Sequence, residues 1–432
     1  MKTNTIMIMI QQLGKILCAQ RRTNGWIFVE LVIAMCTIWF LVDKLWVDQR
    51  SYRAPLGYDT ENCWRFLLGV IPEGTPNYVE PTGEADFATD IQILMDRMRQ
   101  ESEIEEVCLC FWSMPYSPGN TWTSLCRADL DTADIQLESF HSLRITPTYF
   151  DLFRIRDAAG QSVTAQVSDG RLVFVLSQAL ADHLIPNEQA VGKSISVSKS
   201  LDEVYPVAAV LPHFRTIDFE PEESCSFVIL TPDLLNAYGN SYGNSSYQLA
   251  QLCVRMKKQM TEAEMTAFLE RTADRMQYNN KFVQGAKSME EIRIEKMKSW
   301  FDRRNQQMGV ILFVMINVFF GIVGTFWLRT ERRRGEIGLR LAMGSSHRQI
   351  GLLVLLEGLI LLGLTLPFLL LFALNMAKAD LLETYRESLS LFRFASTMGL
   401  AYLLLALLIA LGVWYPMRKA IQLPPAEALR YE

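Results

Sequence analysis

The stretch MGVILFVMINVFFGIVGTFWL, residues 308–328, contains no charged side chain. At about 1.5 Å per residue, a helix of this length spans roughly 30 Å, the thickness of the hydrocarbon core of a bilayer. Three other apolar runs have comparable lengths: residues 26–47, 350–376 and 394–416. Buried helices of soluble domains are usually shorter, at about 10–14 residues. The sequence therefore predicts a membrane protein with four transmembrane α-helices.

The distribution of Lys and Arg beside these runs predicts the orientation of the chain. Residues 1–25, 329–349 and 417–432 carry net charges of +4, +4 and +1, so we expect all three segments in the cytoplasm. Because the whole chain carries −5, the remaining residues carry −14, and most of this charge lies within residues 48–307. That long segment is therefore predicted on the opposite side of the membrane, together with a short loop at residues 377–393.

The N-terminal residues 1–25 contain an amphipathic stretch, which we expect to form a helix on the inner membrane surface or to pack on the other helices. The first apolar run is not followed by a small-residue cleavage site. We therefore expect the first span to remain as an anchor rather than to be removed as a signal peptide.

Residues 48–287 have the composition of a large soluble α/β (α+β) domain inserted between spans 1 and 2. Runs rich in β-branched and aromatic residues, bounded by Pro, Gly or Asp, predict strands at residues 107–112, 121–126, 172–176, 205–210 and 226–230. Helical patterns alternate with them at residues 88–100, 177–184 and 261–276.

Residues 288–307 are strongly charged, contain neither Pro nor Gly, and lead directly into the second span. This pattern predicts a stalk, meaning one helix that continues from the membrane into the exported domain. A continuous helix transmits displacement as a rigid rod. A solvated linker helix is the alternative interpretation.

The predicted cytoplasmic loop at residues 329–349 includes most of the sequence RGEIGLRLAMGSSHRQI, residues 334–350. Helical spacing places Ile337 and Leu341 on one face, with Arg340 beside them. Gly335 and Gly338 weaken the helix, as expected for an element that is stabilised by a partner. The alternative, a helix held on the surface by anionic lipid, explains the arginines but not the apolar pair.

The sequence contains no recognisable motif for nucleotide binding, metal binding or catalysis. The sequence Gly192-Lys193-Ser194 lacks the upstream glycine of a phosphate-binding loop and precedes a predicted strand. The four histidines are isolated from one another and from paired cysteines, so neither a metal site nor an enzyme is predicted. Among the spans, Glu30 and Glu357 are ionisable, and we expect structural roles for both because each lies near a cytoplasmic membrane end.

Six of the eight cysteines lie in the exported domain, where disulfide bonds persist. Cys108 or Cys110 and Cys126 lie on two predicted strands joined by a turn-forming segment, so a bridge such as Cys108–Cys126 is geometrically reasonable. Burial of all six as free thiols is the alternative.

The loop sequence resembles the phrase E-I-G-x-R-x-A-x-G-x-x-x-x-x-I of the MacB/FtsX family of ABC-transporter permeases. The chain end at residues 425–430 resembles the family phrase P-x-E-A-L-R, and residues 145–150, 173–184 and 190–195 resemble phrases of the MacB-type extracytoplasmic domain. The resemblance covers essentially the whole chain and is weakest over residues 48–140.

The resemblance implies two cytoplasmic sites. An ATPase-coupling site is implied at Arg334, Glu336, Ile337, Arg340, Leu341, Met343 and Gly344. A C-terminal cytosolic motif is implied at Pro425, Glu427, Ala428, Leu429 and Arg430.

The resemblance also implies partners and a function. A separate ABC ATPase binds ATP and Mg²⁺, and this chain itself carries no cofactor. A second permease completes a homodimer or heterodimer in the lipid of a bacterial inner membrane, with a periplasmic adaptor and an outer-membrane factor as further partners, and no nucleic acid. The implied function is export driven by mechanotransmission. Signalling to a cell-wall hydrolase, as in FtsX, and release of lipoproteins toward the outer membrane are the alternatives.

Overall fold

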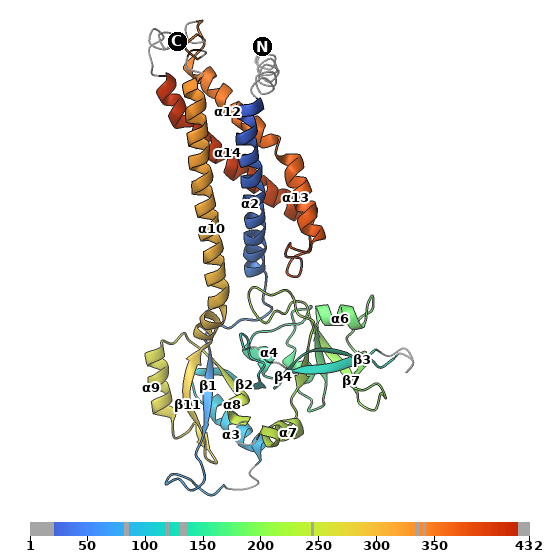
Figure 1. The fold of residues 1–432 in the computed structure, drawn as a ribbon. Coiled ribbons are helices and arrows are strands. Elements are labelled where there is room, and N and C mark those ends of the chain that lie inside the picture. Colours follow the sequence, from blue (N-terminus) through green and yellow to red (C-terminus); the bar gives the residue numbers. More distant parts are fainter. Residues whose placement is uncertain are drawn as a thin grey trace. The chain divides into compact units, whose positions relative to one another are not determined.

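The computed structural model describes residues 21–81, 86–117, 119, 121–129, 136–242, 246–332, 335, 337–339 and 343–421. The chain divides into two compact units (Figure 1). The helical unit comprises Met1–Tyr52 and Trp300–Glu432, and the sheet unit comprises Arg53–Ser299.

The helical unit is built from long apolar helices. They are α2 (Arg21–Arg53), the greater part of α10 (Met289–Arg332), α12 (His347–Gly363), α13 (Leu366–Lys378) and α14 (Leu391–Ile421). In the described part of the chain, four stretches are long and apolar enough to cross a membrane: Gly25–Arg53, Met289–Thr325, Arg348–Lys378 and Leu391–Trp414. The predicted architecture of four spans with a large domain between the first two is confirmed.

The third predicted span, residues 350–376, consists of two helices rather than one. Helix α12 ends at Gly363 and α13 begins at Leu366, with Pro367 in its first turn. Proline has no backbone N–H to donate to the carbonyl of Gly363, and its ring clashes with a carbonyl four residues earlier, so the helix breaks there. At this break the Thr365 hydroxyl donates to the Leu362 carbonyl oxygen at 2.6 Å.

One face of α2 forms the centre of the helical core. Its buried residues recur at helical spacing and include Leu31, Met35 and Trp39. The Trp39 indole nitrogen donates to the Thr397 hydroxyl of α14 at 3.2 Å. Exposed apolar side chains lie on the opposite face of α2 and along α10, α13 and α14, as expected for helices that face lipid or a partner helix.

The sheet unit contains one 11-stranded sheet with the order β10-β11-β1-β9-β2-β4-β3-β6-β7-β5-β8. Its strands are β1 (Cys63–Val70), β2 (Ile104–Phe111), β3 (Trp122–Arg127), β4 (Glu138–Ile145), β5 (Phe174–Ser177), β6 (Ser194–Ser196), β7 (Val204–Leu211), β8 (Cys225–Ile229), β9 (Ala250–Met256), β10 (Gln277–Tyr278) and β11 (Lys281–Ser288). The helices are α3 (Phe87–Arg99), α4 (Tyr149–Leu152), α5 (Thr164–Val167), α6 (Gln178–Leu184), α7 (Pro232–Tyr242), α8 (Ser246–Leu249) and α9 (Glu262–Thr272).

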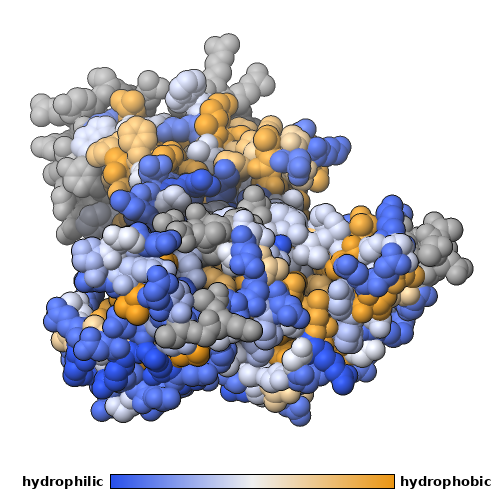
Figure 2. All heavy atoms as spheres, turned by 90° about the horizontal axis from the view of Figure 1, so that it is seen from below, coloured by the Kyte–Doolittle hydropathy of each residue, from blue (hydrophilic) through white to orange (hydrophobic). Residues whose placement is uncertain are grey.

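The sheet has two parts with separate cores. In the first part, β10, β11, β1, β9 and β2 pair antiparallel, and one face packs on a core that includes Leu94 of α3 and Phe268 of α9. In the second part, β8 pairs in parallel with β4, so β4, β3, β6, β7, β5 and β8 close into a ring. The face of the molecule in Figure 2 is largely hydrophilic with small apolar patches, as expected for a domain in water.

The expected Cys108–Cys126 bridge is absent, and both residues are buried free thiols. Strand β4 lies between β2, which carries Cys108, and β3, which carries Cys126. Two strand spacings place the two backbones about 9–10 Å apart. A disulfide requires Cα atoms within about 7 Å, so this pairing was wrong.

Candidate functional site

The described residues of the loop at residues 329–349 lie between α10 and α12. Residues 337–339 are helical, and the amide of Met343 donates to the Leu339 carbonyl oxygen at 2.9 Å. Gly344 follows with φ of 92°, a conformation that favours glycine. Ser346 then caps α12 in a capping box with Gln349. Glycine at position 344 therefore has a backbone reason.

Only part of the predicted coupling site is described. Ile337 is 9% exposed and faces the protein, whereas Leu339 and Met343 are 50% and 72% exposed. The apolar surface that the described loop offers therefore comes from Leu339 and Met343. Four predicted coupling residues lie outside the described residues: Arg334, Glu336, Arg340 and Leu341. The whole predicted C-terminal motif lies outside them too: Pro425, Glu427, Ala428, Leu429 and Arg430.

The chain enters the sheet unit just after α2, and the loop between β7 and β8 holds it there. Arg215 donates through Nη1 to the carbonyl oxygen of Ala54 at 3.0 Å, and its backbone amide donates to the carbonyl oxygen of Leu56 at 3.1 Å. Gly57 has φ of 85°, and a Cβ at this position would lie 1.9 Å from the His213 carbonyl oxygen. Close backbone contact therefore requires glycine here.

The same loop holds the beginning of α10. The Asp218 carboxylate accepts hydrogen bonds from Arg293 of α10 at 2.7 and 3.3 Å. Arg215 donates to the backbone carbonyl oxygen of the same Asp218. We call residues 213–223 the clasp, because they contact both the segment after α2 and the first turns of α10. No sequence motif marked the clasp, since its contacts join residues far apart in the chain.

A second group of charged contacts lies in the helical unit. Arg393 at the start of α14 is fully buried and makes a two-pronged ion pair with Asp43 of α2, with N–O distances of 2.6 and 3.0 Å. Arg386, in the segment between α13 and α14, pairs with Asp48 of α2 at 2.5 Å. No motif marks these residues in the sequence. Their pairing could have been predicted, because acidic residues near the end of the first span and arginines just before the fourth span have opposite charges.

Glu30 lies within the helical unit, against α10. A Cβ added at Gly321 would lie 1.8 Å from a Glu30 carboxylate oxygen, so only glycine leaves room for this side chain. A cavity of about 570 Å³ adjoins both residues and is lined mainly by apolar side chains such as Val29 and Phe313. Glu357, the other predicted acid, is fully buried in α12.

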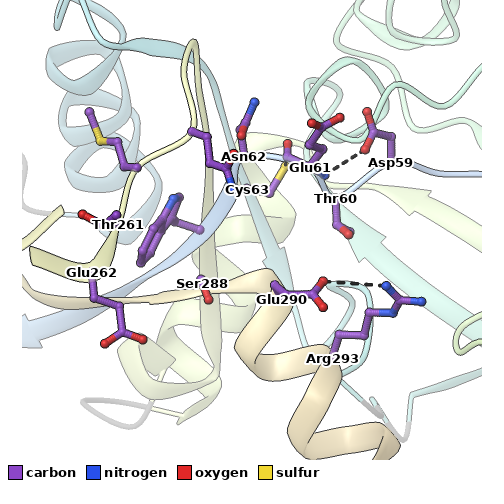
Figure 3. Close-up of a pocket in the computed structure, with 13 residues that line it drawn as sticks. Asp59, Thr60, Glu61, Asn62, Cys63, Thr261, Glu262, Ser288, Glu290 and Arg293 are labelled. Atoms are coloured by element: carbon purple, nitrogen blue, oxygen red, sulfur yellow. Dashed lines mark hydrogen bonds and ion pairs between the residues drawn. The ribbon is translucent and has the colours of Figure 1, made fainter. Parts of the chain in front are cut away.

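Figure 3 shows a cavity of about 790 Å³ in the sheet unit, beside the first turn of α10. Four carboxylates and one guanidinium line it: Asp59, Glu61, Glu262, Glu290 and Arg293. The cavity is therefore acidic overall. No histidine is among the lining residues, so a nucleophile paired with an imidazole base is absent from this cavity.

His141 of β4 lies beside the clasp. Its Nδ1 is 2.8 Å from a Glu223 carboxylate oxygen, and its Nε2 is 3.1 Å from the Gly119 carbonyl oxygen. Burial lowers the pKa of the imidazole, but the Glu223 carboxylate and the Gly119 carbonyl outweigh burial and raise the pKa above its ordinary value. Since both ring nitrogens face acceptors, the protonated ring suits this position best.

The described residues include no group of three or more His, Cys, Asp or Glu side chains placed to hold a metal ion. Gly192 has φ of 84°, and strand β6 begins at Ser194 instead of a helix. Lys193 forms an ion pair with Glu188 at 2.8 Å. This segment therefore lacks the helix N-terminus of a nucleotide-binding loop.

Residues 308–425 match the family model of the FtsX-like permease C-terminal region. No curated protein matches the sequence significantly. Among solved structures, the periplasmic region of MacB from Actinobacillus actinomycetemcomitans is 14% identical, with a TM-score of 0.32, over 53% of this chain and 90% of that one. A domain of a putative permease from Porphyromonas gingivalis is 13% identical, with a TM-score of 0.33, over 54% and 97%. The extracellular domain of the noncanonic ABC-type transporter YknZ from Gram-positive bacteria is 11% identical, with a TM-score of 0.30, over 51% and 100%.

The family match covers α12, α13, α14 and the apolar part of α10, with the loop between α10 and α12. Over this region the chain is similar to the C-terminal part of FtsX-like permeases. This match agrees with the resemblance of the loop sequence at residues 334–350 to the MacB/FtsX family.

Proposed function

We propose that this chain is the permease subunit of a MacB-type export system, with its sheet unit on the periplasmic side of a bacterial inner membrane. A separate ATPase binds ATP and Mg²⁺ and docks on the loop at residues 329–349. A second permease, identical or related, completes the dimer. A periplasmic adaptor and an outer-membrane factor complete the export path. In this proposal the chain catalyses no reaction and converts ATP-driven movement into movement of the sheet unit.

The observation that carries this proposal is the continuity of α10. It is a single helix of 44 residues from Met289 to Arg332, which corresponds to roughly 66 Å at about 1.5 Å per residue. The helix contains the predicted stalk at residues 288–307, apart from Ser288 at the end of β11, and also the second span. It ends just before the loop that we assign to the ATPase. A displacement at the loop would therefore be carried along one rigid element.

The contacts of the clasp support the proposal that movement of α10 reaches the sheet unit. Asp218 holds Arg293 near the start of α10, while Arg215 holds the carbonyl oxygen of Ala54, just after α2. Both segments that connect the helical unit with the sheet unit thus meet the same short loop. Relative movement of α2 and α10 would act on this loop first. Mechanotransmission therefore predicts that the clasp responds to the nucleotide state of the ATPase.

The test interrupts α10 between the loop at residues 329–349 and the clasp, without changing a residue of either. Gln306 is exposed on α10, and Gln306→Pro removes a helical hydrogen bond at a cost of about 3 kcal/mol. The permease is reconstituted with its ATPase, and hydrogen exchange of residues 213–223 is compared between nucleotide-free and ATP-trapped states. We expect a nucleotide-dependent change in the parent and in Gln306→Ala, and its loss in Gln306→Pro while ATP hydrolysis continues. An equal change in Gln306→Pro would exclude the rod mechanism.

Export is preferred to signalling because the sheet unit, Arg53–Ser299, is large, whereas the family's division-type members have a much smaller loop. Co-purification separates the functions directly. An adaptor and an outer-membrane factor bound to the sheet unit support export. A cell-wall hydrolase or a lipoprotein carrier bound there instead would replace export by signalling or by lipoprotein release.

A further inference from the structure

Three buried cysteines meet on one face of the first part of the sheet. Cys108 and Cys110 are on β2 and Cys253 is on β9, and all three are 0% exposed. Residues two apart on a strand share a face, and Cys253 lies directly opposite Cys108 in the antiparallel register of β2 and β9. The cluster therefore results from strand pairing between segments 145 residues apart, as the register Cys108↔Cys253 shows.

The thiols of this cluster are in mutual contact. Hydrogen bonds from Cys108 and Cys110 lower the pKa of Cys253, whereas burial raises the pKa values of Cys108 and Cys110. Cys110 lies opposite Gln251, and its sulfur is 3.6 Å from the Gln251 backbone oxygen. Cys108 is therefore the cysteine whose backbone faces Cys253 directly.

The backbone geometry suits a covalent bond between this pair. Residues directly opposite each other in an antiparallel pair have Cα atoms about 4.5–5.5 Å apart. Disulfides have Cα separations of about 4.4–6.8 Å. The diagonal pair Cys110 and Cys253 is more distant, since diagonal neighbours are about 7–8 Å apart. Only Cys108 and Cys253 meet the requirement without movement of the backbone.

We propose that Cys108 and Cys253, which are free thiols in this structure, form a disulfide bond that joins β2 to β9 in the mature protein. The inference rests on the proposed placement of the sheet unit in an oxidising compartment. Oxidation takes place during folding, because the sulfurs are inaccessible once the unit is folded. One cysteine thiolate attacks a disulfide oxidant and forms a mixed disulfide, and the second thiolate then displaces the remaining oxidant thiol. Two cysteine thiols become one S–S bond, and the oxidant is reduced to two thiols.

This bond would stabilise the part of the sheet that carries α10. Strand β9 pairs with β1, β1 pairs with β11, and α10 follows β11 directly. A bridge that closes a loop of this length restricts the unfolded chain strongly. We expect the Cys108→Ala/Cys253→Ala variant of the full chain to melt about 10 °C below the oxidised parent. Cys225, a buried thiol on β8, provides the matched control as Cys225→Ala.

The direct test is peptide mapping of the full-length protein, purified from cells lysed in denaturant with N-ethylmaleimide and digested without reductant. We expect one linked peptide pair that contains Cys108 and Cys253, with Cys110 and Cys225 alkylated. Cys110→Ala should leave this linkage intact. Alkylation of both Cys108 and Cys253 in the parent, or a linkage of Cys253 to Cys110, would overturn the proposal.

A parallel arm separates failure of the bond from failure of the placement. Ala159 is exposed in the sheet unit, and Ala159→Cys is treated in intact cells with a membrane-impermeant thiol reagent. If Ala159→Cys reacts but Cys108 and Cys253 are free, the disulfide is wrong and the placement stands. If Ala159→Cys reacts only after permeabilisation, the placement fails and the disulfide inference fails with it.

Discussion

Arg393 donates from Nε and Nη2 to the two carboxylate oxygens of Asp43, at 3.0 and 2.6 Å, in a site from which water is excluded. Its remaining nitrogen, Nη1, donates to the backbone carbonyl oxygens of Glu383 and Glu387. One guanidinium thus joins α2, α14 and the segment between α13 and α14. Fork geometry and complete pairing are the conditions under which a buried ion pair is tolerated.

Arg393→Met should destabilise the helical unit, because it leaves the buried Asp43 carboxylate unpaired. Breaking one side of a buried pair costs about 3–5 kcal/mol. The double variant Asp43→Leu/Arg393→Met removes both charges and should recover much of this loss. Arg50→Ala is the control, since Arg50 is 57% exposed in its pair with Glu387 and such pairs contribute about 0–1 kcal/mol. The stabilities of the variants are compared by heating in detergent followed by size-exclusion chromatography. Equal stability of Arg393→Met and Arg50→Ala would contradict the prediction.

Asp218→Asn should loosen the start of α10. The change removes a charge-assisted contact with Arg293 whose acceptor is buried, and such contacts contribute about 1.5–3 kcal/mol. Hydrogen exchange over residues 289–299 should accelerate in the full-length protein. Glu290→Gln provides a matched control on the same arginine, because Glu290 is 65% exposed and 3.7 Å from Arg293. If both variants exchange alike, the clasp does not hold the stalk.

The sheet unit should lose stability at alkaline pH through His141. A raised pKa in the folded state means that protonation of His141 favours folding. This contribution is complete below the unfolded pKa of about 6.5 and disappears as the pH rises through the higher folded value. The melting temperature of the parent should therefore fall between pH 6 and pH 9. His141→Gln should flatten this part of the profile, whereas a substitution of the exposed His183 should not. An unchanged slope in His141→Gln would refute the assignment.

Met343→Asp should weaken binding of the ATPase without destabilising the permease. Met343 is 72% exposed, so the substitution costs nothing in the free protein. Burying the new charge at an interface costs at least about 1.4 kcal/mol, or a tenfold loss of affinity. Leu341→Asp and Arg340→Glu should act in the same direction, the latter in a salt-dependent manner. Co-purification and stimulated ATP hydrolysis are the measurements. Leu381→Asp, at an exposed position in the short loop between α13 and α14, should leave ATPase binding and stimulated hydrolysis unchanged. If Met343→Asp and Leu341→Asp bind the ATPase as the parent does, the loop at residues 329–349 is not the coupling element.

The predicted topology can be checked with single cysteines in the otherwise native chain. The described native cysteines are buried or half-buried, so unmodified protein provides the background. Ala159→Cys should react with an impermeant reagent in intact cells. Met343→Cys should react only after permeabilisation. The reverse pattern would invert the protein in the membrane.

Several elements of the fold were predictable because their signals are local. The apolar runs, the Pro- and Gly-free stalk and the strand-like segments at β2, β3, β5, β7 and β8 all appear in the sequence as composition and spacing. Strand β9 was not recognised. Its seven residues, AQLCVRM, are all buried, so the alternation of polar and apolar residues that marks a half-exposed strand is absent.

Arg255 of β9 shows why such a strand escapes recognition. Its guanidinium is fully buried and donates to the backbone carbonyl oxygens of Asp59, Glu61 and Leu152. An arginine in the sequence suggests a surface position, because burial of a charge is unfavourable without partners. The partners here come from two distant segments, residues 59–61 and Leu152, and only the folded chain supplies them.

The sequence by itself determined that this protein crosses a membrane, which segments cross it, and that a long helix leads from the second span into a soluble domain. These properties depend on the length and polarity of contiguous segments, because each segment partitions between water and lipid largely by its own composition. The tertiary structure decided that Cys253 rather than Cys126 faces Cys108, that Asp43 holds Arg393, and that one loop meets both connecting segments. Those contacts depend on strand register and helix packing between residues far apart in the chain, which local composition does not encode.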